Sequence, residues 1–293
     1  MCESMPSCQG QGEFTPSKQE GLGSVLHQWL NIMGSIKSKA LSGKYTPSMS
    51  NIISNPVLYV DMNAGCGWNH EVDCPGSPLI FLDARKNHDF SMSCYFIEKD
   101  LAAWQELSQR LGPKKHWATR DGMQLTPPDP DHLFWTYNTD HEEIVPILVN
   151  QNMSYGLLYH DPNSNPNFDL FRRITTSPKS RFVDILIRIS GTAYKRQSKG
   201  VTNFGLKNGH DHLIGKYPSL REQLKSIKKR EWIIREIEQG DKHQWTFLLG
   251  TNWTDFKAWE SKGFFNIKSV KGTEILNKVT YTKKELEDLD ESE

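Results

Sequence analysis

The stretch "VLYVDMNAGCGWNHEVDCPGSP" at residues 57–78 joins an apolar run to a turn of small and polar residues. The apolar run contains Asp61. Two glycines, Gly65 and Gly67, follow the run and are separated by one residue. In a doubly wound α/β sheet, a glycine-rich turn after the first strand lets the backbone approach a ligand beyond the carboxyl ends of the strands. The stretch therefore predicts this fold, with a ligand site at the turn.

The spacing of the glycines narrows the class of ligand. A dinucleotide fingerprint places a third glycine three residues after the second, where the backbone cradles a pyrophosphate. This sequence has His70 at that position. We therefore expect a nucleoside ligand without phosphates.

The rest of the chain repeats an alternation of strand-like and helix-like segments. Short apolar runs typical of strands buried on both faces occur at 57–62, 93–98, 155–161, 182–190 and 245–250. Helical patterns occur at 77–87, 99–111, 139–152, 219–239 and 255–263. This order predicts an α/β fold with a doubly wound, mostly parallel sheet.

Two extensions flank the predicted sheet. Apolar residues at helical spacing, from Val25 to Ile36, predict a leading helix, and the last apolar segment, 264–282, predicts a C-terminal antiparallel hairpin with its turn near Lys271. We expect a flexible N-terminus and leading helix over 1–50, one main domain over 51–282, and an acidic tail over 283–293.

Composition bounds the partners and the compartment. Lys plus Arg and Asp plus Glu are 35 each, so any anionic partner must be bound by a local patch of charge. No uncharged apolar run approaches the roughly 18 residues of a membrane span, so we expect a soluble cytoplasmic protein without a membrane partner. The five cysteines, Cys2, Cys8, Cys66, Cys74 and Cys94, are few and odd in number, and we expect them to be reduced.

Three acidic residues lie at the end of a predicted strand or in a predicted loop. Glu98 ends the second apolar run, where a carboxylate can accept hydrogen bonds from both hydroxyls of a ribose. Asp121 lies in a following loop, from which its side chain could reach an adenine amino group. Asp161 and Pro162 follow an apolar strand at the edge where a substrate would meet the ligand.

This order of motifs resembles the Rossmann-like S-adenosylmethionine-dependent methyltransferases. The segment "VDMNAGCG" at 60–67 resembles their first motif, and "DPN" at 161–163 resembles the D-P-P-Y motif of enzymes that methylate amino groups. Within that superfamily, the opening and "GSPL" at 76–79 are similar to the three-Cys-motif partner proteins, which are bacterial and phage-associated. The resemblance implies a methyltransferase fold and S-adenosylmethionine as cofactor. It implies that the cofactor is bound by Asp61, Asn63, Gly65, Cys66, Gly67, Glu98 and Asp121.

The sequence departs from the family pattern at two places. Asn63 stands where the first motif has an aromatic residue, and Asn163 and Ser164 stand where D-P-P-Y has proline and an aromatic residue. The second departure leaves the target base open.

Methylation of an exocyclic amine requires groups that prepare the lone pair of a poor nucleophile. We expect the Asp161 carboxylate and the Pro162 carbonyl to accept from the amine, and Asn163 to bond a base edge. His160 alternates to the other face of its strand and ranks behind Asp161 as a base.

Cations and aromatic residues near this edge favour a nucleic acid substrate. We expect Tyr159 and Tyr194 to stack on a flipped base, with Tyr155 and Phe168 as further candidates, and Lys195 and Arg196 to contact phosphates beside Arg188 and Lys199. These aromatic residues could equally belong to the core.

Three functions remain open. The favoured one is methylation of an amino group on nucleic acid; the second is methylation of a small molecule or protein. The third is a non-catalytic nucleotide-binding or partner protein. Cys66, His70 and Cys74 form C-x3-H-x3-C, but a zinc site would need a fourth ligand, and we expect no metal. The sequence leaves the oligomeric state open.

Overall fold

A computed structural model describes residues 15–44, 55–111, 134–152, 154–162, 166–196, 219–239, 244–282 and 285–287. Two compact units are present. Unit 1 comprises 1–159 with 182–184, and unit 2 comprises 160–181 with 185–293.

Unit 1 holds the parallel part of the sheet, with strands in the order β5-β4-β1-β6. These strands are β1 (Val57–Asp61), β4 (Met92–Glu98), β5 (Phe134–Asn138) and β6 (Gly156–His160). A separate two-stranded sheet, β2 (Trp68–Asn69) with β3 (Cys74–Pro75), interrupts the connection from β1 to the next helix. All five residues of β1, β5 and β6 are buried, as expected for strands covered on both faces.

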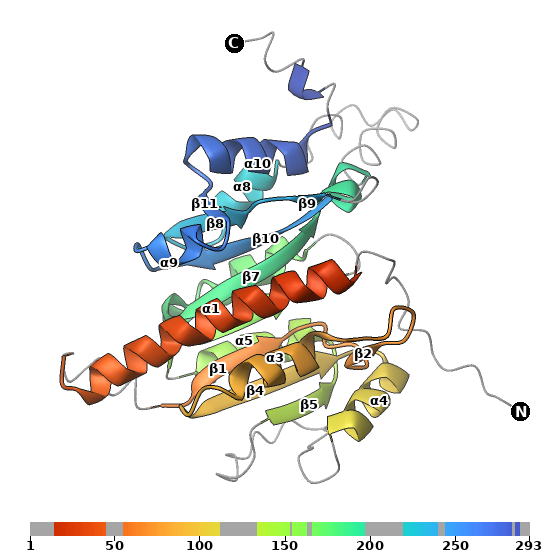
Figure 1. Ribbon diagram of the computed structural model, residues 1–293, viewed down its shortest axis with the longest axis vertical. Coiled ribbons are helices and arrows are strands. Elements are labelled where there is room, and N and C mark those ends of the chain that lie inside the picture. The colour runs from red at the N-terminus through yellow and green to blue at the C-terminus, as the bar shows by residue number, and fades with distance from the viewer. Residues whose placement is uncertain are drawn as a thin grey trace, which may run out of the picture. The chain divides into compact units, whose positions relative to one another are not determined.

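The helices of unit 1 cover these strands. They are α1 (Thr15–Leu41), α3 (Ser77–Arg85), α4 (Leu101–Leu111) and α5 (His141–Gln151). Figure 1 shows α1 and α3 on one face of the strands and α5 on the other. The Tyr59 ring of β1 stacks on Phe81 of α3 with centroids 3.5 Å apart, and the Trp29 indole of α1 donates to Asp184 at 3.2 Å. The predicted leading helix and doubly wound arrangement are confirmed.

Unit 2 holds the antiparallel strands. Strand β7 (Val183–Ser190), whose first two residues belong to unit 1, pairs with β10 (Gln244–Thr251). Strand β10 also pairs with β8 (Glu231–Arg235) and β9 (Glu238–Gln239), and β8 pairs with β11 (Phe264–Asn266). The helical elements are α6 (Phe168–Ile174), the 3-10 helix η2 (Pro178–Phe182), α8 (Leu220–Lys225), α9 (Lys257–Glu260) and α10 (Val270–Thr280).

The predicted C-terminal hairpin over 264–282 is wrong in its second half. Only Phe264–Asn266 is a strand, and the helix α10 follows. The Ser269 hydroxyl caps this helix by accepting from the Gly272 amide at 3.1 Å, so Ser269 is a serine N-cap rather than a strand residue. The antiparallel C-terminal strands are instead β8, β10 and β11.

The predicted helix over 219–239 is wrong beyond Lys225. A capping box between Ser219 and Glu222 begins α8, which ends after six residues. Trp232, Ile233 and Ile234 are consecutive buried residues of β8, between β10 and β11. A continuous apolar run that includes β-branched residues fits a strand with neighbours on both sides, whereas a surface helix would bury only one face.

Replacing Gly272 by alanine is expected to destabilise unit 2 by about 1–3 kcal/mol, because overpacked sites cost this much. A Cβ atom there would lie 2.0 Å from the Asn266 carbonyl oxygen, which is backbone and cannot rotate away. Urea unfolding measures the loss. Gly23→Ala in α1 is the control, because its nearest neighbour would be a side-chain atom at 3.5 Å. Equal stability of the two variants would contradict the close packing of α10 on the β11 turn.

Candidate functional site

The turn after β1 is shaped by glycines at positions that other residues rarely occupy. Gly65 has φ of +61° and Gly67 has φ of +77°, both in the left-handed region. The Gly76 amide donates to the Gly67 carbonyl at 2.8 Å, and a Cβ on Gly76 would lie 2.9 Å from the Gly67 carbonyl carbon. The turn therefore folds back on itself through a backbone contact that leaves no room for a side chain at Gly76.

Glu98 joins this turn to the end of β4. Its Oε2 accepts from the Gly65 amide at 2.8 Å, and its Oε1 accepts from the Asp100 amide at 2.8 Å. Burial raises the pKa of the Glu98 carboxyl, and hydrogen bonds from the Asp100, Gly65 and Lys99 amides offset part of this rise. A carboxylate has about four acceptor positions, so it can still accept from a hydroxyl donor.

The residues of the turn fit a nucleoside-type ligand. A Cβ on Gly65 would meet nothing within 4 Å among the residues that the structure describes, so open space within this part of the chain adjoins the backbone beside Glu98. The Oδ1 atom of Asn63 is buried without a hydrogen-bond partner among the described residues. Asp61 is fully buried at the end of β1, and its Oδ1 accepts from the Asn63 amide at 3.2 Å. The region of the turn thus has two carboxylates, Asp61 and Glu98, and open space beside Gly65. It also has an acceptor, the Asn63 Oδ1 atom, without a partner among the described residues.

Asn138 is a residue of this region that the sequence did not single out. It ends β5, is buried, and donates to the carbonyls of Glu98 and Lys99 at 3.1 Å each. These bonds fix the backbone that carries the Glu98 carboxylate. The signal was the strand "FWTYN" at 134–138, whose aromatic and threonine residues favour a strand although polar residues interrupt the apolar run.

Beside the turn, a charged cluster surrounds His70. Glu106 of α4 lies 2.6 Å from the His70 Nε2 and 2.6 Å from Arg110, whose guanidinium lies over the Trp68 ring at 5.6 Å from its centroid. Burial raises the pKa of Glu106, but the Arg110 and His70 hydrogen bonds outweigh it and leave the pKa lowered. Cys66, His70 and Glu106 place three potential metal-ligand atoms within 4.8 Å of one another.

The expectation that all five cysteines are reduced is wrong for Cys66. This residue is in a disulfide, whereas Cys74 and Cys94 are free. A sulfur held in a disulfide is not a thiolate, which is the form that binds a metal or attacks as a nucleophile.

In unit 2, Asp161 makes an ion pair with Arg188 of β7. The two side chains are only 13% and 17% exposed. His160 beside Asp161 is buried, and its ring contacts Phe171 edge-on at 5.4 Å. Arg188 therefore pairs with Asp161, the carboxylate that we expect from the sequence to accept a hydrogen bond from the substrate amine.

The other predicted substrate residues lie in varied environments. Tyr159 and Tyr194 are buried, and so are Tyr155 and Phe168. Lys195 is half-buried and donates to Gln244 at 3.0 Å, and Arg196 is exposed. Asp121, Asn163, Ser164 and Lys199 lie outside the described residues.

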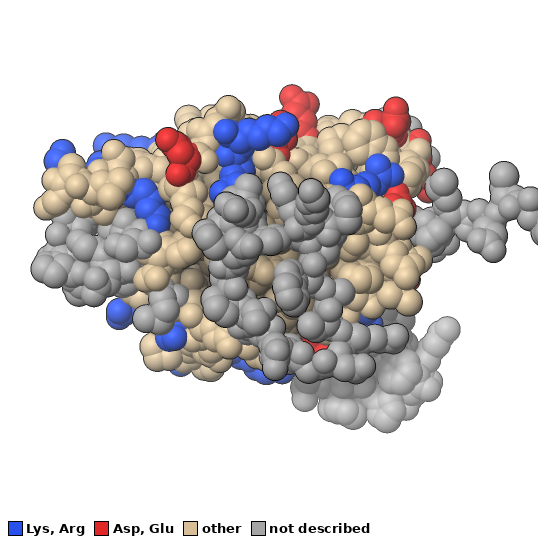
Figure 2. All heavy atoms as spheres, turned by 90° about the horizontal axis from the view of Figure 1, so that it is seen from below, with Lys and Arg blue, Asp and Glu red and all other residues tan. Residues whose placement is uncertain are grey.

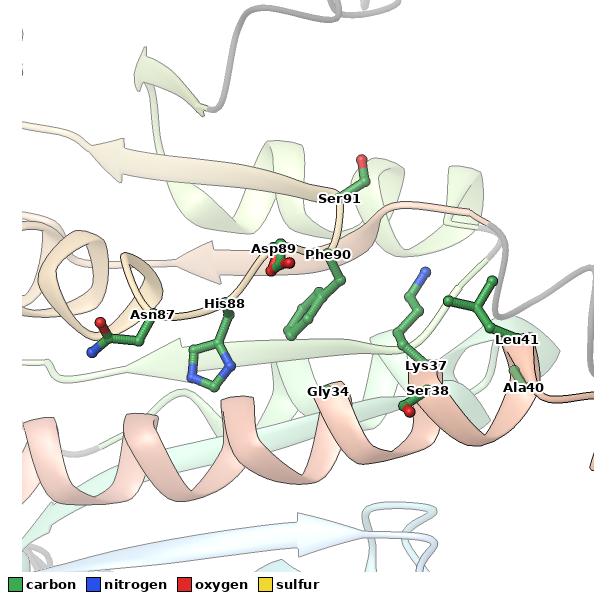
Figure 3. Close-up of a pocket in the computed structure, with 10 residues that line it drawn as sticks. All are labelled: Gly34, Lys37, Ser38, Ala40, Leu41, Asn87, His88, Asp89, Phe90 and Ser91. Atoms are coloured by element: carbon green, nitrogen blue, oxygen red, sulfur yellow. The ribbon is translucent and has the colours of Figure 1, made fainter.

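A cavity of about 510 Å³ lies elsewhere in unit 1. Figure 3 shows it between the last turns of α1, from Gly34 to Leu41, and the loop 87–91 that precedes β4. Glu98 is at the other end of β4, so the cavity and the glycine turn lie at opposite ends of that strand. None of the predicted site residues lines this cavity.

Charge on the described surface is mixed on one face. Figure 2 shows Lys and Arg side chains scattered among Asp and Glu over the face that it displays. The described residues include no helix long and apolar enough to cross a membrane.

Comparison of the sequence with models of known families and with curated proteins finds no match. Among solved structures, the chain is similar to a putative methyltransferase, yhhF, from Escherichia coli (TM-score 0.34, 11% identity, 85% of this chain and 92% of that one). It is also similar to Trm1 from Pyrococcus horikoshii in complex with S-adenosyl-L-methionine (TM-score 0.38, 11% identity, 73% of this chain and 56% of that one). A third similar structure is an rRNA methylase from Streptococcus thermophilus (TM-score 0.35, 13% identity, 67% of this chain and 88% of that one). The fold itself is α/β, with a parallel part of the sheet and antiparallel C-terminal strands. Because these TM-scores lie below 0.5, we base the function on residues of this chain.

Proposed function

We propose that the protein is an S-adenosylmethionine-dependent methyltransferase whose acceptor is an exocyclic amino group on a nucleic acid. The observation that carries the proposal is the hydrogen bond between the Gly65 amide and Glu98. It joins the glycine turn after β1 to the acid that ends the neighbouring parallel strand β4. Ligands of doubly wound sheets lie beyond these carboxyl ends. The sequence resemblance to three-Cys-motif partner proteins supports the same assignment.

The cofactor would lie against the turn. Glu98 would accept from the two ribose hydroxyls, and Gly65 and Gly67 would let the backbone approach. Asp61, Asn63 and Cys66 would line the same turn, and Asp121 would reach the adenine amino group. S-adenosylmethionine supplies an electrophilic methyl group on a sulfonium sulfur.

On the acceptor side, Asp161 would accept a hydrogen bond from the amine and the Pro162 carbonyl a second one. These bonds would direct the nitrogen lone pair toward the methyl carbon, and Asn163 would bond the base edge. The bound cofactor would supply its sulfonium methyl group to the amine nitrogen, sulfur would keep the electron pair of the broken carbon–sulfur bond, and Asp161 or water would take the amine proton. The ion pair with Arg188 would hold the orientation of the carboxylate.

Lys195 and Arg196 would contact phosphates near the acceptor. Both lie on the helical turn 191–196 that follows β7. Tyr159 and Tyr194 are buried and would have to leave these positions to stack on a flipped base.

Tritiated methyl transfer from S-adenosylmethionine to a mixed pool of DNA and RNA tests the proposal. Transfer to nucleic acid supports it. Transfer only to cellular protein or to small molecules would move the function to the second class, and binding of the cofactor without any transfer would move it to a non-catalytic partner protein. Mass spectrometry of host nucleosides, with and without expression of the protein, would identify the modified base.

Cofactor affinity is expected to fall as the pH is lowered through the Glu98 pKa, which burial raises above its ordinary value of 4.5. The ionised carboxylate can accept from both ribose hydroxyls, whereas protonation turns one oxygen into a donor. Affinity is therefore full above this pKa and lost below it. Calorimetric titrations from pH 7 down to pH 5 measure the change. Glu98→Gln should bind weakly with a flat profile, and an identical pH profile for the two proteins would remove Glu98 from the site.

A further inference from the structure

A concentration of positive charge lies on unit 2, away from Asp161 and Arg188. Eight cations fall within two short segments, 172–181 and 225–230, which contain no Asp or Glu. We call them the basic surface: Arg172, Arg173, Lys179, Arg181, Lys225, Lys228, Lys229 and Arg230. The whole chain has a formal net charge of zero, so these segments depart strongly from its average.

Hydrogen bonds join the two segments into one surface. The Lys228 amide donates to the Thr175 hydroxyl at 3.2 Å, and the Lys229 ammonium donates to the Ser180 carbonyl at 2.6 Å. Arg172 donates to Ser226 and to Gln223 at 2.9 Å each. The Arg172 and Lys229 side chains, which are held by such bonds, lose less conformational freedom when an anion binds.

A third segment, at Asn252, links the two basic segments through hydrogen bonds. The Asn252 side chain donates to the Arg181 carbonyl at 2.9 Å and accepts from the Arg230 amide at 2.8 Å. Asn252 directly follows β10, and Arg230 directly precedes β8. The basic surface therefore lies at a defined end of the antiparallel strands.

Half of these eight cations have no ion-pair partner among the described residues. Asp169 pairs with Arg172. Lys179, Lys225, Lys228 and Arg230 make no ion pair with the described residues, and all but Lys179 are exposed. Concentrated exposed cations indicate an anionic partner.

The apolar residues of the two segments face inward, which argues against a membrane surface. Ile174 and Ile227 are 3% and 2% exposed. The large apolar residues that are exposed in the described chain, Leu41, Leu101 and Val270, lie outside both segments. Interfacial membrane binding depends on apolar side chains that enter the lipid, and these segments offer none.

The register of the strands relates the basic surface to the acceptor residues. Arg188 pairs with Phe247 on β10, and Asn252 lies five residues further along. At about 3.4 Å per residue, the basic surface is roughly 17 Å from Arg188 along the sheet. This distance corresponds to about five nucleotides of a duplex strand.

We infer that the basic surface binds the phosphodiester backbone of the nucleic acid substrate several nucleotides from the methylated base. The inference rests on the proposed function. The guanidinium groups present planar donor forks that suit phosphate, and the ammonium groups add point charges. The surface would then bind independently of sequence, and the residues near Asp161 would select the base.

The test is the salt dependence of duplex binding. In Lys225→Ala/Lys228→Ala/Arg230→Ala, the slope of log affinity against log salt should fall by up to about 2.7 for duplex DNA, since each lost phosphate contact contributes about 0.9. The matched control, Lys39→Ala/Lys44→Ala/Lys86→Ala, removes the same charge from exposed positions of unit 1 and should keep the wild-type slope. Fluorescence anisotropy with a labelled duplex of two helical turns measures both.

DNA and RNA duplexes of the same sequence distinguish the two sources of the phosphodiester backbone, and a loss of slope with either supports the inference. Equal slopes in the triple variant and its control would overturn it. A loss confined to binding of phosphatidylserine vesicles would also overturn it, in favour of a membrane surface.

Calorimetric titration of S-adenosylmethionine into the same triple variant separates this inference from the proposed function. The cofactor affinity should equal that of the wild type, because all three changes lie outside the glycine turn. If the wild type itself does not bind the cofactor, the proposed function fails while the duplex measurement still decides whether the surface binds nucleic acid.

Discussion

Replacing Asp161 by asparagine is expected to slow methyl transfer about a hundredfold, because a lost charge-assisted acceptor in a dry site is worth roughly 3 kcal/mol. The variant should bind S-adenosylmethionine as the wild type does, because the loss falls on the transition state. Single-turnover transfer of a tritiated methyl group measures the rate, and calorimetry measures the affinity. Transfer at the wild-type rate would contradict the role of Asp161.

Because Asp161 is paired with Arg188, asparagine is a more informative replacement than alanine for measuring the role of Asp161 in transfer. Asp161→Ala would leave a largely buried guanidinium without its partner and should lower the free energy of unfolding, by up to about 3 kcal/mol for such pairs. Asparagine keeps the size and one carbonyl acceptor, so it should unfold nearly as the wild type does. The double variant Asp161→Ala/Arg188→Met should regain stability without regaining transfer. Recovery of transfer in the double variant would show that the carboxylate is structural only.

Replacing Gly65 by valine is expected to reduce affinity for S-adenosylmethionine by a hundredfold or more. Gly65 has φ of +61°, and its Cβ would enter the open space beside Glu98 where we place the cofactor. A valine at positive φ also carries backbone strain of about 1–2 kcal/mol.

The chain offers a matched control for this strain. Gly43 has φ of +72°, and a Cβ added there would also meet nothing within 4 Å, but Gly43 lies in the turn after α1. Gly43→Val should therefore lose a similar amount of stability and keep full cofactor affinity. If both variants lose affinity equally, the effect is one of stability and the cofactor lies elsewhere.

The alternation of apolar runs and helical patterns predicted most of unit 1. A continuous apolar run such as Val57–Asp61 is typical of a strand covered on both faces, because neither face of such a strand meets water. Strand β5 was missed because Thr136 and Asn138 interrupt its aromatic run, although Tyr95 and Trp135 stack across the pair with centroids 4.7 Å apart. Cross-strand pairs of this kind are invisible until the neighbouring strand is known.

Errors in unit 2 came from segments in which local and tertiary preferences differ. Lys and Glu residues around Trp232 favour a helix, but burial between two strands decides the outcome. Gly272 near the predicted hairpin turn lies instead in the first turn of α10, where contact with the Asn266 carbonyl requires a residue without a Cβ.

The candidate site was partly predictable. The order of Asp61, Gly65, Gly67 and Glu98 along two adjacent strands indicated which groups could meet, and the structure brings Gly65 and Glu98 into hydrogen-bond contact. The pairing of Asp161 with Arg188 was not predictable, because it depends on how residues far apart in the chain are placed in unit 2. The cluster of cations in the sequence had instead favoured phosphates as the partners of Arg188.

The most direct test of the central claim is a calorimetric titration of S-adenosylmethionine into the wild-type chain, Gly65→Val and Gly43→Val. We predict saturable binding of one cofactor per chain in the wild type and in Gly43→Val, and a loss of a hundredfold or more in Gly65→Val. Absence of binding to the wild type, or equal affinity in the two variants, would contradict a cofactor site at the glycine turn.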